Sequence, residues 1–276
     1  MDVLITGASG RVGTAITDHL GEHDDYRFAA LDREAHPDHD TYVADITDRG
    51  AIEPAFDGQD AVIHLAGDPS TGASWESVLE NNVIGTHNVV EVAAAADIDR
   101  VLFASTNHVV GMYWKALEPA ISDEPVDLTV DHTDPPRPDS YYAVSKLFGE
   151  DLGRYVVERS PDPSIDRFLA MRIGWILDRE YDHPFGPAER GVAEGRFSRD
   201  SEAYDRRVAM CRALWCSRRD FARLVHQLLQ TDATGFDVVY ARSGGSRQWL
   251  DIDHARERFG FEPVDDADAY DRPPGD

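Results

Sequence analysis

A tyrosine and a lysine one helical turn apart are the pair in this sequence best suited to proton transfer. They lie in Tyr142–Lys146, a Tyr-x-x-x-Lys sequence inside a segment with helical periodicity. Side chains four positions apart lie on one face of an α-helix. Tyrosine, with a pKa of about 10, is a weak base at neutral pH, but a nearby ammonium favours the phenolate and lowers that pKa. The pair therefore predicts a tyrosine base activated by a lysine.

The scarcity of lysine supports a chemical role for Lys146. Only one other lysine, Lys115, occurs in a chain that otherwise uses arginine. A planar guanidinium does not replace a compact ammonium where a point charge is needed. The neighbouring Tyr141 lacks the spacing, because the fourth residue after it is Ser145. Tyr142 is therefore the expected base.

A glycine turn follows the first predicted strand, within Val3–Gly13. In a Gly-x-x-Gly-x-x-Gly turn, the first glycine permits the tight bend, the second lets the backbone approach a pyrophosphate, and the third lets helix and strand pack closely. The helix start adds free N–H groups and a partial positive charge. An ordinary β–α turn is the alternative. The context favours a dinucleotide site formed by Gly7, Gly10, Arg11, Val12 and Gly13.

The choice of cofactor depends on Asp32, which ends the second predicted strand about 20 residues after the turn. A carboxylate there accepts hydrogen bonds from the adenosine ribose hydroxyls and repels a 2′-phosphate, which favours NAD. Arg33 is the competing signal, because it could pair with the 2′-phosphate of NADP. We expect NAD, with NADP as the less favoured alternative.

Together with Thr106–Tyr113 and Arg172–Gly174, these motifs resemble the extended short-chain dehydrogenases/reductases of the NAD-dependent epimerase/dehydratase family. Within that family the resemblance is to uronate dehydrogenases and haloarchaeal sugar dehydrogenases. It covers residues 1–177 well and continues more loosely through Trp215–Phe221. It implies NAD-dependent oxidation of the anomeric hydroxyl of an aldose, uronate or sugar phosphate to a lactone, with Tyr142 as the base.

The same resemblance implies further site residues. Thr106 takes the place of the catalytic hydroxyl, and Asn82 matches the helix asparagine that supports the lysine and its water. The implied substrate contacts are Ser105, Thr106, Asn107, His108 and Tyr142. The implied cofactor contacts beyond the glycine turn are Asp32, Arg33, Asp45, Ile46, Leu65, Ala66, Gly67, Tyr142 and Lys146.

Two positions depart from the family pattern. Thr106 stands where relatives have serine, which is a tolerable exchange of hydroxyls. Met210 stands where relatives place an arginine, five residues before a tryptophan, for the substrate's carboxylate or phosphate. An unpaired buried anion is costly, so a neutral aldose is favoured unless another arginine of the segment substitutes: Arg206, Arg207 or Arg212.

Two other functions remain open. A nucleotide-sugar epimerase or dehydratase would keep its NAD bound, although such enzymes usually need a longer C-terminal part. A non-catalytic NAD-sensing protein would not need the Tyr142–Lys146 pair. Net NADH formation with a free sugar distinguishes the sugar dehydrogenase from both.

The composition is strongly acidic, with 52 acidic and 27 basic residues and a formal net charge of −25. Such a surface disfavours nucleic-acid binding and resembles that of haloarchaeal cytoplasmic proteins, in which salt screens the repulsion. Two cysteines, Cys211 and Cys216, provide neither a disulfide framework nor a metal site. No secretory leader or membrane-spanning run is evident, so we expect a cytoplasmic protein.

Apolar strands alternate with helical patterns, which predicts an α/β fold: a Rossmann-type, doubly wound parallel sheet with a small C-terminal substrate lobe. We expect residues 1–177 to form the NAD-binding core, and 178–276 the lobe plus the last core helix and strand. Trp114–Ser140 is predicted to be a loop and Asp178–Leu214 to be irregular. The expected strands are Asp2–Ile5, Phe28–Leu31, Thr41–Val43, Ala61–Leu65, Arg100–Ala104, Phe168–Ile173 and Asp237–Ala241. The expected helices are Arg11–Leu20, Ala51–Phe56, Trp75–Ala96, Tyr142–Glu158, Arg219–Leu229 and Ile252–Phe259.

A homodimer is also expected. In the family, the helices that correspond to Trp75–Ala96 and Tyr142–Glu158 pair with their copies in a four-helix interface. The apolar residues expected there are Val89, Val90, Ala93, Leu147, Leu152 and Tyr155; the alternative is that they face only their own sheet.

Overall fold

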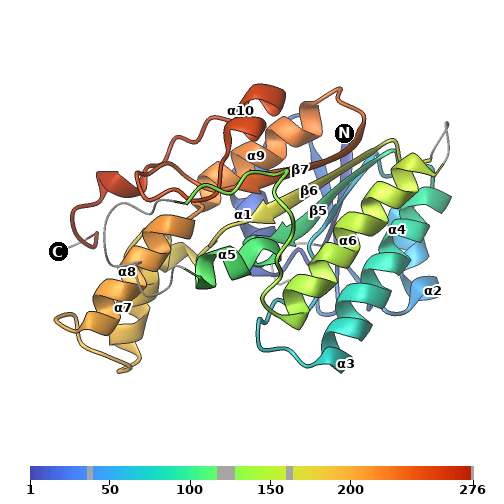
Figure 1. Ribbon diagram of the computed structural model, residues 1–276. Coiled ribbons are helices and arrows are strands. Elements are labelled where there is room, and N and C mark those ends of the chain that lie inside the picture. Colours follow the sequence, from blue (N-terminus) through green and yellow to red (C-terminus); the bar gives the residue numbers. More distant parts are fainter. Residues whose placement is uncertain (36–39, 117–127, 160–163, 275–276) are drawn as a thin grey trace.

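A seven-stranded parallel sheet forms the centre of the molecule (Figure 1). The computed structural model describes residues 1–35, 40–116, 128–159 and 164–274. The strand order is β3-β2-β1-β4-β5-β6-β7. The chain turns back between β1 and β4, and ligands of open α/β sheets bind at such a switch point, outside the carboxyl ends of the strands. The strands are β1 (Asp2–Thr6), β2 (Arg27–Asp32), β3 (Thr41–Val43), β4 (Ala61–His64), β5 (Arg100–Thr106), β6 (Arg167–Ile173) and β7 (Gly235–Ala241).

Alternate residues of the central strands face two separate hydrophobic layers. Val3 and Ile5 of β1 belong to the layer that contains helices α1 and α9, whereas Leu4 belongs to the layer of α2 and α4. Successive side chains of a strand point to opposite faces, and parallel sheets are covered on both faces. The expected doubly wound α/β fold is confirmed. The helices are α1 (Arg11–Leu20), α2 (Arg49–Ile52), α3 (Trp75–Val78), α4 (Gly85–Ala95), α5 (Gly111–Lys115), α6 (Tyr141–Glu158), α7 (Gly186–Ala193), α8 (Glu202–Leu214), α9 (Arg218–Gln230) and α10 (Asp253–Phe259).

The helix expected over Trp75–Ala96 is divided. Its middle, η2 (Leu79–Ile84), is π-helical and separates α3 from α4. Wider turns of this kind frequently occur at functional sites. Asn82 lies on this turn and is buried. Short 3₁₀ segments are η1 (Glu53–Phe56), η3 (Asn107–Val110), η5 (Arg179–Tyr181) and η6 (Ala267–Ala269).

The prediction that Asp178–Leu214 is irregular is wrong. Helices α7 and α8 occupy much of it and pack on each other at one end of the molecule, through Phe185, Ala188 and Tyr204 (Figure 1). Ser201 caps α8 by accepting a hydrogen bond from the Tyr204 N–H. Arginine is a good helix former, so the arginines of α8 are compatible with a helix that shows no wide apolar stripe.

The loop expected over Trp114–Ser140 is observed only in part. Helix α5 includes its first two positions, and residues 117–127 lie outside the described residues. In the stretch 128–140, the described backbone makes one isolated bridge, between Val130 and Leu250. No helix of the described ranges is long and apolar enough to cross a bilayer.

Three of the side chains expected at a dimer interface face the core instead. Val89, Val90 and Ala93 are fully buried within their own layer. Tyr155 of α6 is 60% exposed, and three other large apolar side chains are exposed on α3 and α6. The homodimer stays a prediction, and its candidate surface is Trp75, Tyr141, Val144 and Tyr155.

Candidate active site

The glycine turn has the close backbone contacts that its sequence predicts. Gly7 has a φ of +73°, and a Cβ at this residue would lie 2.8 Å from the Ala66 nitrogen. A Cβ at Gly13 would overlap the carbonyl oxygen of Ala8. Gly10 precedes α1 and provides no side-chain cap, so the first N–H groups of the helix remain open to a ligand. These features fit a pyrophosphate.

The carboxylate of Asp32 lies beside this turn. Its oxygens accept hydrogen bonds from the Ser9 N–H (3.0 Å) and the Arg33 N–H (2.7 Å). The Arg33 side chain is exposed. The guanidinium of Arg11 forms an ion pair with Asp178 at 2.8 Å. Arg11 is thus left with its backbone N–H for a phosphate, whereas its side chain binds the C-terminal part.

The segments expected to contact the adenine and the nicotinamide ribose differ in exposure. The Ile46 side chain is 6% exposed and packs against Gly85, so it belongs to the core rather than to an open site. Asp45 accepts a hydrogen bond from the Thr47 N–H at 2.9 Å. Leu65–Gly67 is partly exposed and contacts the glycine turn at Ala66. Leu65–Gly67 is therefore placed near the expected cofactor path.

His64, which directly precedes Leu65–Gly67, connects this segment to neighbouring elements, a role that the sequence did not reveal. Its ring is fully buried, 2.7 Å from Thr6 Oγ1 and 3.0 Å from Thr86 Oγ1. Burial lowers the pKa of His64 to about 3, which makes the ring a neutral link between β1, β4 and α4.

Helix α6 brings Tyr142 and Lys146 to the same place. Ser140 caps this helix by accepting from the Ala143 N–H. Lys146 Nζ lies 6.0 Å from the centre of the Tyr142 ring, and a Cβ on Gly67 would lie 3.8 Å from Nζ. Burial lowers the pKa of Lys146 to about 8. No hydrogen-bond acceptor for Nζ occurs in the described part of the chain, so a ligand could supply one.

The expectation that Lys146 lowers the pKa of Tyr142 is not met in this structure. Burial raises the pKa of Tyr142 above its usual value; a hydrogen bond with Thr106 opposes the rise, and the charge of Asp68 adds to it. Desolvation favours the neutral phenol. Positive charge from a ligand bound near the phenol would favour the phenolate.

Thr106 and Ser105 follow one another in β5 but have different surroundings. Thr106 ends the strand, is close enough to Tyr142 to lower the pKa of the phenol, and accepts a hydrogen bond from the His108 N–H at 3.2 Å. Ser105 is 2% exposed and donates to Glu150 at 2.5 Å. Neighbouring side chains in a strand point to opposite faces. The structure therefore does not support Ser105 as a substrate contact, whereas Thr106 lies near Tyr142, the expected catalytic base.

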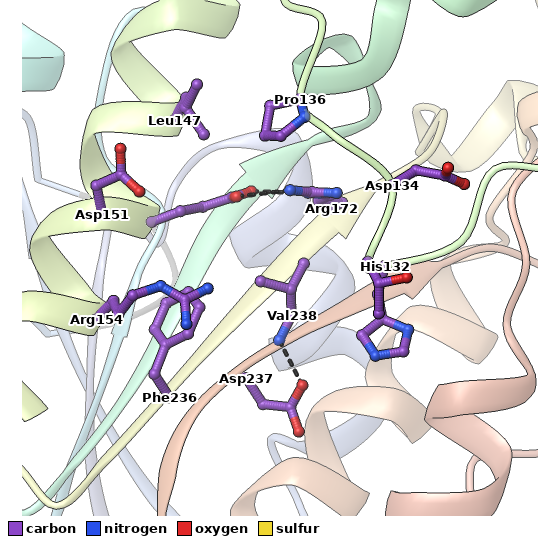
Figure 2. A pocket seen from close by; sticks show the side chains of 12 residues that line it. His132, Asp134, Pro136, Leu147, Asp151, Arg154, Arg172, Phe236, Asp237 and Val238 are labelled. Carbon is purple, nitrogen blue, oxygen red and sulfur yellow. Dashed lines mark hydrogen bonds and ion pairs between the residues drawn. The ribbon is translucent and has the colours of Figure 1, made fainter. Parts of the chain in front are cut away.

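Glu150 in turn binds Arg172 through two hydrogen bonds of 2.9 and 3.0 Å. Figure 2 shows Arg172 in a cleft of about 470 Å³ that is lined from α6, β6 and β7, with Leu147 and Pro136 on one side. Ser105 is thus part of a buried ionic network beneath α6, separate from Tyr142.

Asn82 reaches the catalytic helix through Ser145. Its Nδ2 donates to Ser145 Oγ (2.9 Å) and to the Asp68 carbonyl (3.0 Å), and its Oδ1 accepts from the Asp68 N–H (2.6 Å). Its hydrogen bonds in the described ranges are not made to Lys146 itself. Ser145 and Asp68 are support residues that sequence reasoning missed, although Ser145 stands inside the Tyr-x-x-x-Lys motif.

The expected sugar contacts Asn107 and His108 follow Thr106 directly. Asn107 is 7% exposed. The His108 ring lies 6.3 Å from the Tyr142 ring, centre to centre, and its Nδ1 is 2.9 Å from Asp139 Oδ2. Asp139 was not predicted as a site residue. The structure thus brings Thr106, His108 and Tyr142 together.

The three arginines considered for an anionic group have different partners. Arg206 pairs with Glu202 on an exposed face of α8, and Arg212 pairs with Asp268. Arg207 lies with its guanidinium 5.6 Å from the centre of the Trp175 ring. Met210 is partly buried against the main core. Of the three, Arg207 is the one without an ion pair in the described chain.

Comparison with known proteins identifies the family. Residues 3–162 match the NAD dependent epimerase/dehydratase family. This chain belongs to it. Two similar proteins come from Haloferax volcanii: an NAD-dependent glucose-6-phosphate dehydrogenase (37% identical) and an L-arabinose 1-dehydrogenase (NAD(P)(+)) (36% identical). Each alignment covers 96% of this chain, and 94% and 97% of the two relatives respectively.

Solved structures support the same placement in the family. Uronate dehydrogenase from Agrobacterium tumefaciens matches with a TM-score of 0.73 and 26% identity, over 100% of this chain and 91% of that one. A mutant of that enzyme has been solved in complex with NAD. The epimerase/dehydratase family member described here is therefore similar, over its full length, to NAD-dependent sugar dehydrogenases.

Proposed function

We propose that this family member oxidises the anomeric hydroxyl of a cyclic sugar to a lactone, with NAD as the oxidant. The observation that carries the proposal is the grouping of Tyr142, Thr106 and Lys146: Thr106 is close enough to the phenol to lower its pKa, and the ammonium, 6.0 Å from the Tyr142 ring, has no acceptor in the described chain. This group lies at the carboxyl end of β5, next to the segment that contacts the glycine turn.

The residues present fit a dinucleotide. The open N–H groups at the start of α1 would hold the pyrophosphate, and Asp32 would accept the adenosine ribose hydroxyls. Lys146 would bind the nicotinamide ribose. We propose NAD over NADP, because the carboxylate of Asp32 is anchored at the turn, whereas Arg33 extends into solvent.

The proton steps follow from the side chains. Tyr142 takes the proton of the anomeric hydroxyl, and the Thr106 hydroxyl donates to the same oxygen. NAD, when bound, accepts the hydride and also provides a positive charge near the phenol. That charge and the ammonium of Lys146 both favour the phenolate that burial disfavours. General base catalysis of this kind contributes about 10²–10⁴-fold.

We propose that residues 178–276 supply the sugar side of the site, in addition to the last core helix and strand. A neutral aldose is favoured because Met210 replaces the arginine of relatives. Arg207 is the alternative partner for a carboxylate or phosphate. Met210→Arg should raise the efficiency toward a uronate or sugar phosphate relative to its neutral parent; a wild type that already prefers the anionic sugar would contradict the neutral assignment.

The test is a substrate panel in high salt with NAD, read by the absorbance of NADH. It contains D-glucose, L-arabinose, D-glucuronate, D-glucose 6-phosphate and UDP-glucose. Steady NADH formation with a free sugar supports the proposal. Epimerisation of UDP-glucose without net NADH would favour a nucleotide-sugar epimerase, and NAD binding with no turnover would favour a sensing protein.

A further inference from the structure

A nearly buried carboxylate holds one nitrogen of the His108 ring. Asp139 Oδ2 lies 2.9 Å from His108 Nδ1; the carboxylate side chain is 8% exposed and the histidine side chain 36% exposed. An ionised carboxylate only accepts hydrogen bonds, so Nδ1 carries the proton. In a neutral imidazole, the lone pair is then on Nε2. Asp139 therefore determines which nitrogen of His108 can accept a hydrogen bond.

The side chain of Asp139 is fixed from several directions. Ser140 Oγ donates to its second oxygen at 3.0 Å. Lys115, one of the two lysines in the sequence, has its Nζ 3.9 Å from Oδ2 and donates to the Asp139 carbonyl oxygen at 3.2 Å. A Cβ at Gly111 would overlap the carboxylate, so the close approach depends on glycine. These contacts leave the carboxylate little freedom to turn away.

The backbone around Asp139 is attached to the segment that contains His108. The Arg137 N–H donates to the Val109 carbonyl (2.8 Å), and the Met112 N–H donates to the Arg137 carbonyl (3.0 Å). Asp139 also directly precedes Ser140, the cap of the helix on which Tyr142 lies. The carboxylate, the imidazole and the phenol are therefore held in one fixed arrangement.

The His108 ring borders the ring of Tyr142. The His108 and Tyr142 rings meet edge to face, at 68° and 6.3 Å between centres. In the described chain, Nε2 has no hydrogen-bond partner. The ring that carries this unpartnered acceptor thus lies next to the Tyr142 ring, whose phenol would bind the oxygen undergoing oxidation.

We propose that Asp139 is a positioning residue, which keeps His108 Nε2 as the acceptor for a sugar hydroxyl on the carbon next to the reacting one. This proposal rests on the proposed function. It adds a selection rule: a sugar with that hydroxyl donates to Nε2, whereas a 2-deoxy sugar does not. Sites built to bond a hydroxyl discriminate strongly against analogues that lack it.

Asp139→Asn tests the rule with little change of shape. The amide can donate to Nδ1, which moves the ring proton to Nε2 and turns the acceptor into a donor. For the sugar that the panel identifies, we expect KM to rise about tenfold or more, the scale of one lost hydrogen bond. The kcat should stay within about threefold and the NAD dissociation constant unchanged. With the 2-deoxy analogue, variant and wild type should be alike.

A double-mutant cycle separates positioning from general structural support. If Asp139 acts through His108, Asp139→Asn should add less than about twofold in a His108→Ala background. Full additivity would overturn the proposal. The matched control is Asp151→Asn, the same change at an exposed aspartate of α6 that has no hydrogen bond or ion pair in the described chain (Figure 2); it should leave KM unchanged.

Failure of the positioning role and failure of the proposed function give different results. A wild type that oxidises no sugar defeats the proposed function; an active wild type with an unchanged Asp139→Asn defeats the positioning role alone. If Asp139→Asn loses its circular dichroism, Lys115→Met takes its place, because that side chain is half-exposed. For Lys115→Met we expect KM to rise about threefold. This rise is smaller than that of Asp139→Asn because the carboxylate itself remains, and it should disappear in the His108→Ala background. No rise would overturn the positioning role.

Discussion

The N-terminal and the C-terminal parts of the chain are stabilised by different interactions. In the N-terminal part, β1, β4 and β5 are buried apolar strands, and the polar link through His64 is uncharged. The C-terminal part shares a hydrophobic layer with that core through α9 and β7, and arginine ion pairs add to the junction. The ion pairs at this junction are Arg11–Asp178, Arg179–Asp18 and Arg218–Asp18, and Arg190–Asp178 and Arg219–Asp265 lie within the C-terminal part.

This difference indicates where salt acts on the molecule. Hydrophobic burial does not depend on the screening of charges, whereas the repulsion among 52 acidic residues does. The arginines at the junction each neutralise an acidic neighbour. We expect α7 and α8, which pack in a small hydrophobic cluster of their own, to open first as the repulsion grows at low salt, and the central sheet to open last.

The largest expected effect is loss of structure at low salt. With a net charge of −25, repulsion is barely screened in dilute buffer and should unfold the chain. Circular dichroism across a salt series measures this loss. Hydrogen exchange at intermediate salt should show α7 and α8 losing protection before β1 and β5. Full stability in dilute buffer would contradict the expected loss of structure. Simultaneous loss of protection in α7, α8, β1 and β5 would contradict the expected order of opening.

Arg218→Met should break the junction at its most buried point. This side chain is 4% exposed, pairs with Asp18 at 2.6 Å and donates to the carbonyls of Arg11 and Leu177. Removing one partner of a buried pair costs about 3 kcal/mol. Thermal denaturation in high salt measures it, with Arg206→Met, an exposed pair worth about 0.5 kcal/mol or less, as the control. Equal decreases in Tm for the two variants would mean that the buried Arg218 pair stabilises the protein no more than the exposed Arg206 pair does.

Tyr142→Phe should leave both parts folded and abolish most of the chemistry. The phenol is the proposed base, so kcat should fall by about 100-fold or more. NAD binding should be retained, since the glycine turn and Asp32 are untouched. The readouts are initial rates of NADH formation and a fluorescence titration with the cofactor. A variant within about threefold of wild type would remove Tyr142 from the base position.

Asp32→Ala should give a smaller change, confined to the cofactor. Removing a carboxylate that repels a 2′-phosphate should move the NADP/NAD efficiency ratio upward by about tenfold. Catalytic efficiencies with both cofactors measure the ratio, and Asp45→Ala serves as a comparison at the next strand end. An unchanged ratio would show that Asp32 does not read the ribose.

Backbone features were the part of the structure that the sequence predicted well. Apolar runs located all seven strands: the central ones are continuously hydrophobic because they are buried on both faces, whereas the short edge strand β3 is largely exposed. Glycine spacing predicted the turn at Gly7 and Gly13, where a side chain would collide with the backbone. The spacing of Tyr142 and Lys146 placed both on one helix face.

Side-chain directions and long-range pairs could not be predicted in this way. Ser105 and Thr106 have similar hydroxyls, and only the strand geometry shows that Ser105 binds Glu150. Asp139 meets His108 across 31 positions, and Arg11 meets Asp178 across 167. Such pairs follow from the tertiary fold rather than from any local pattern, and the desolvation that raises the pKa of Tyr142 has the same origin.

The most direct test of oxidation at the anomeric carbon is the stoichiometry of the reaction with purified protein in high salt. The free sugar that performs best in the panel should yield one lactone for each NADH formed, with Tyr142→Phe as the inactive reference. Lactone is quantified by its hydroxamate and NADH by absorbance. Equal amounts that depend on Tyr142 are the predicted result. NADH without lactone, or no oxidation of any free sugar, would contradict oxidation at the anomeric carbon.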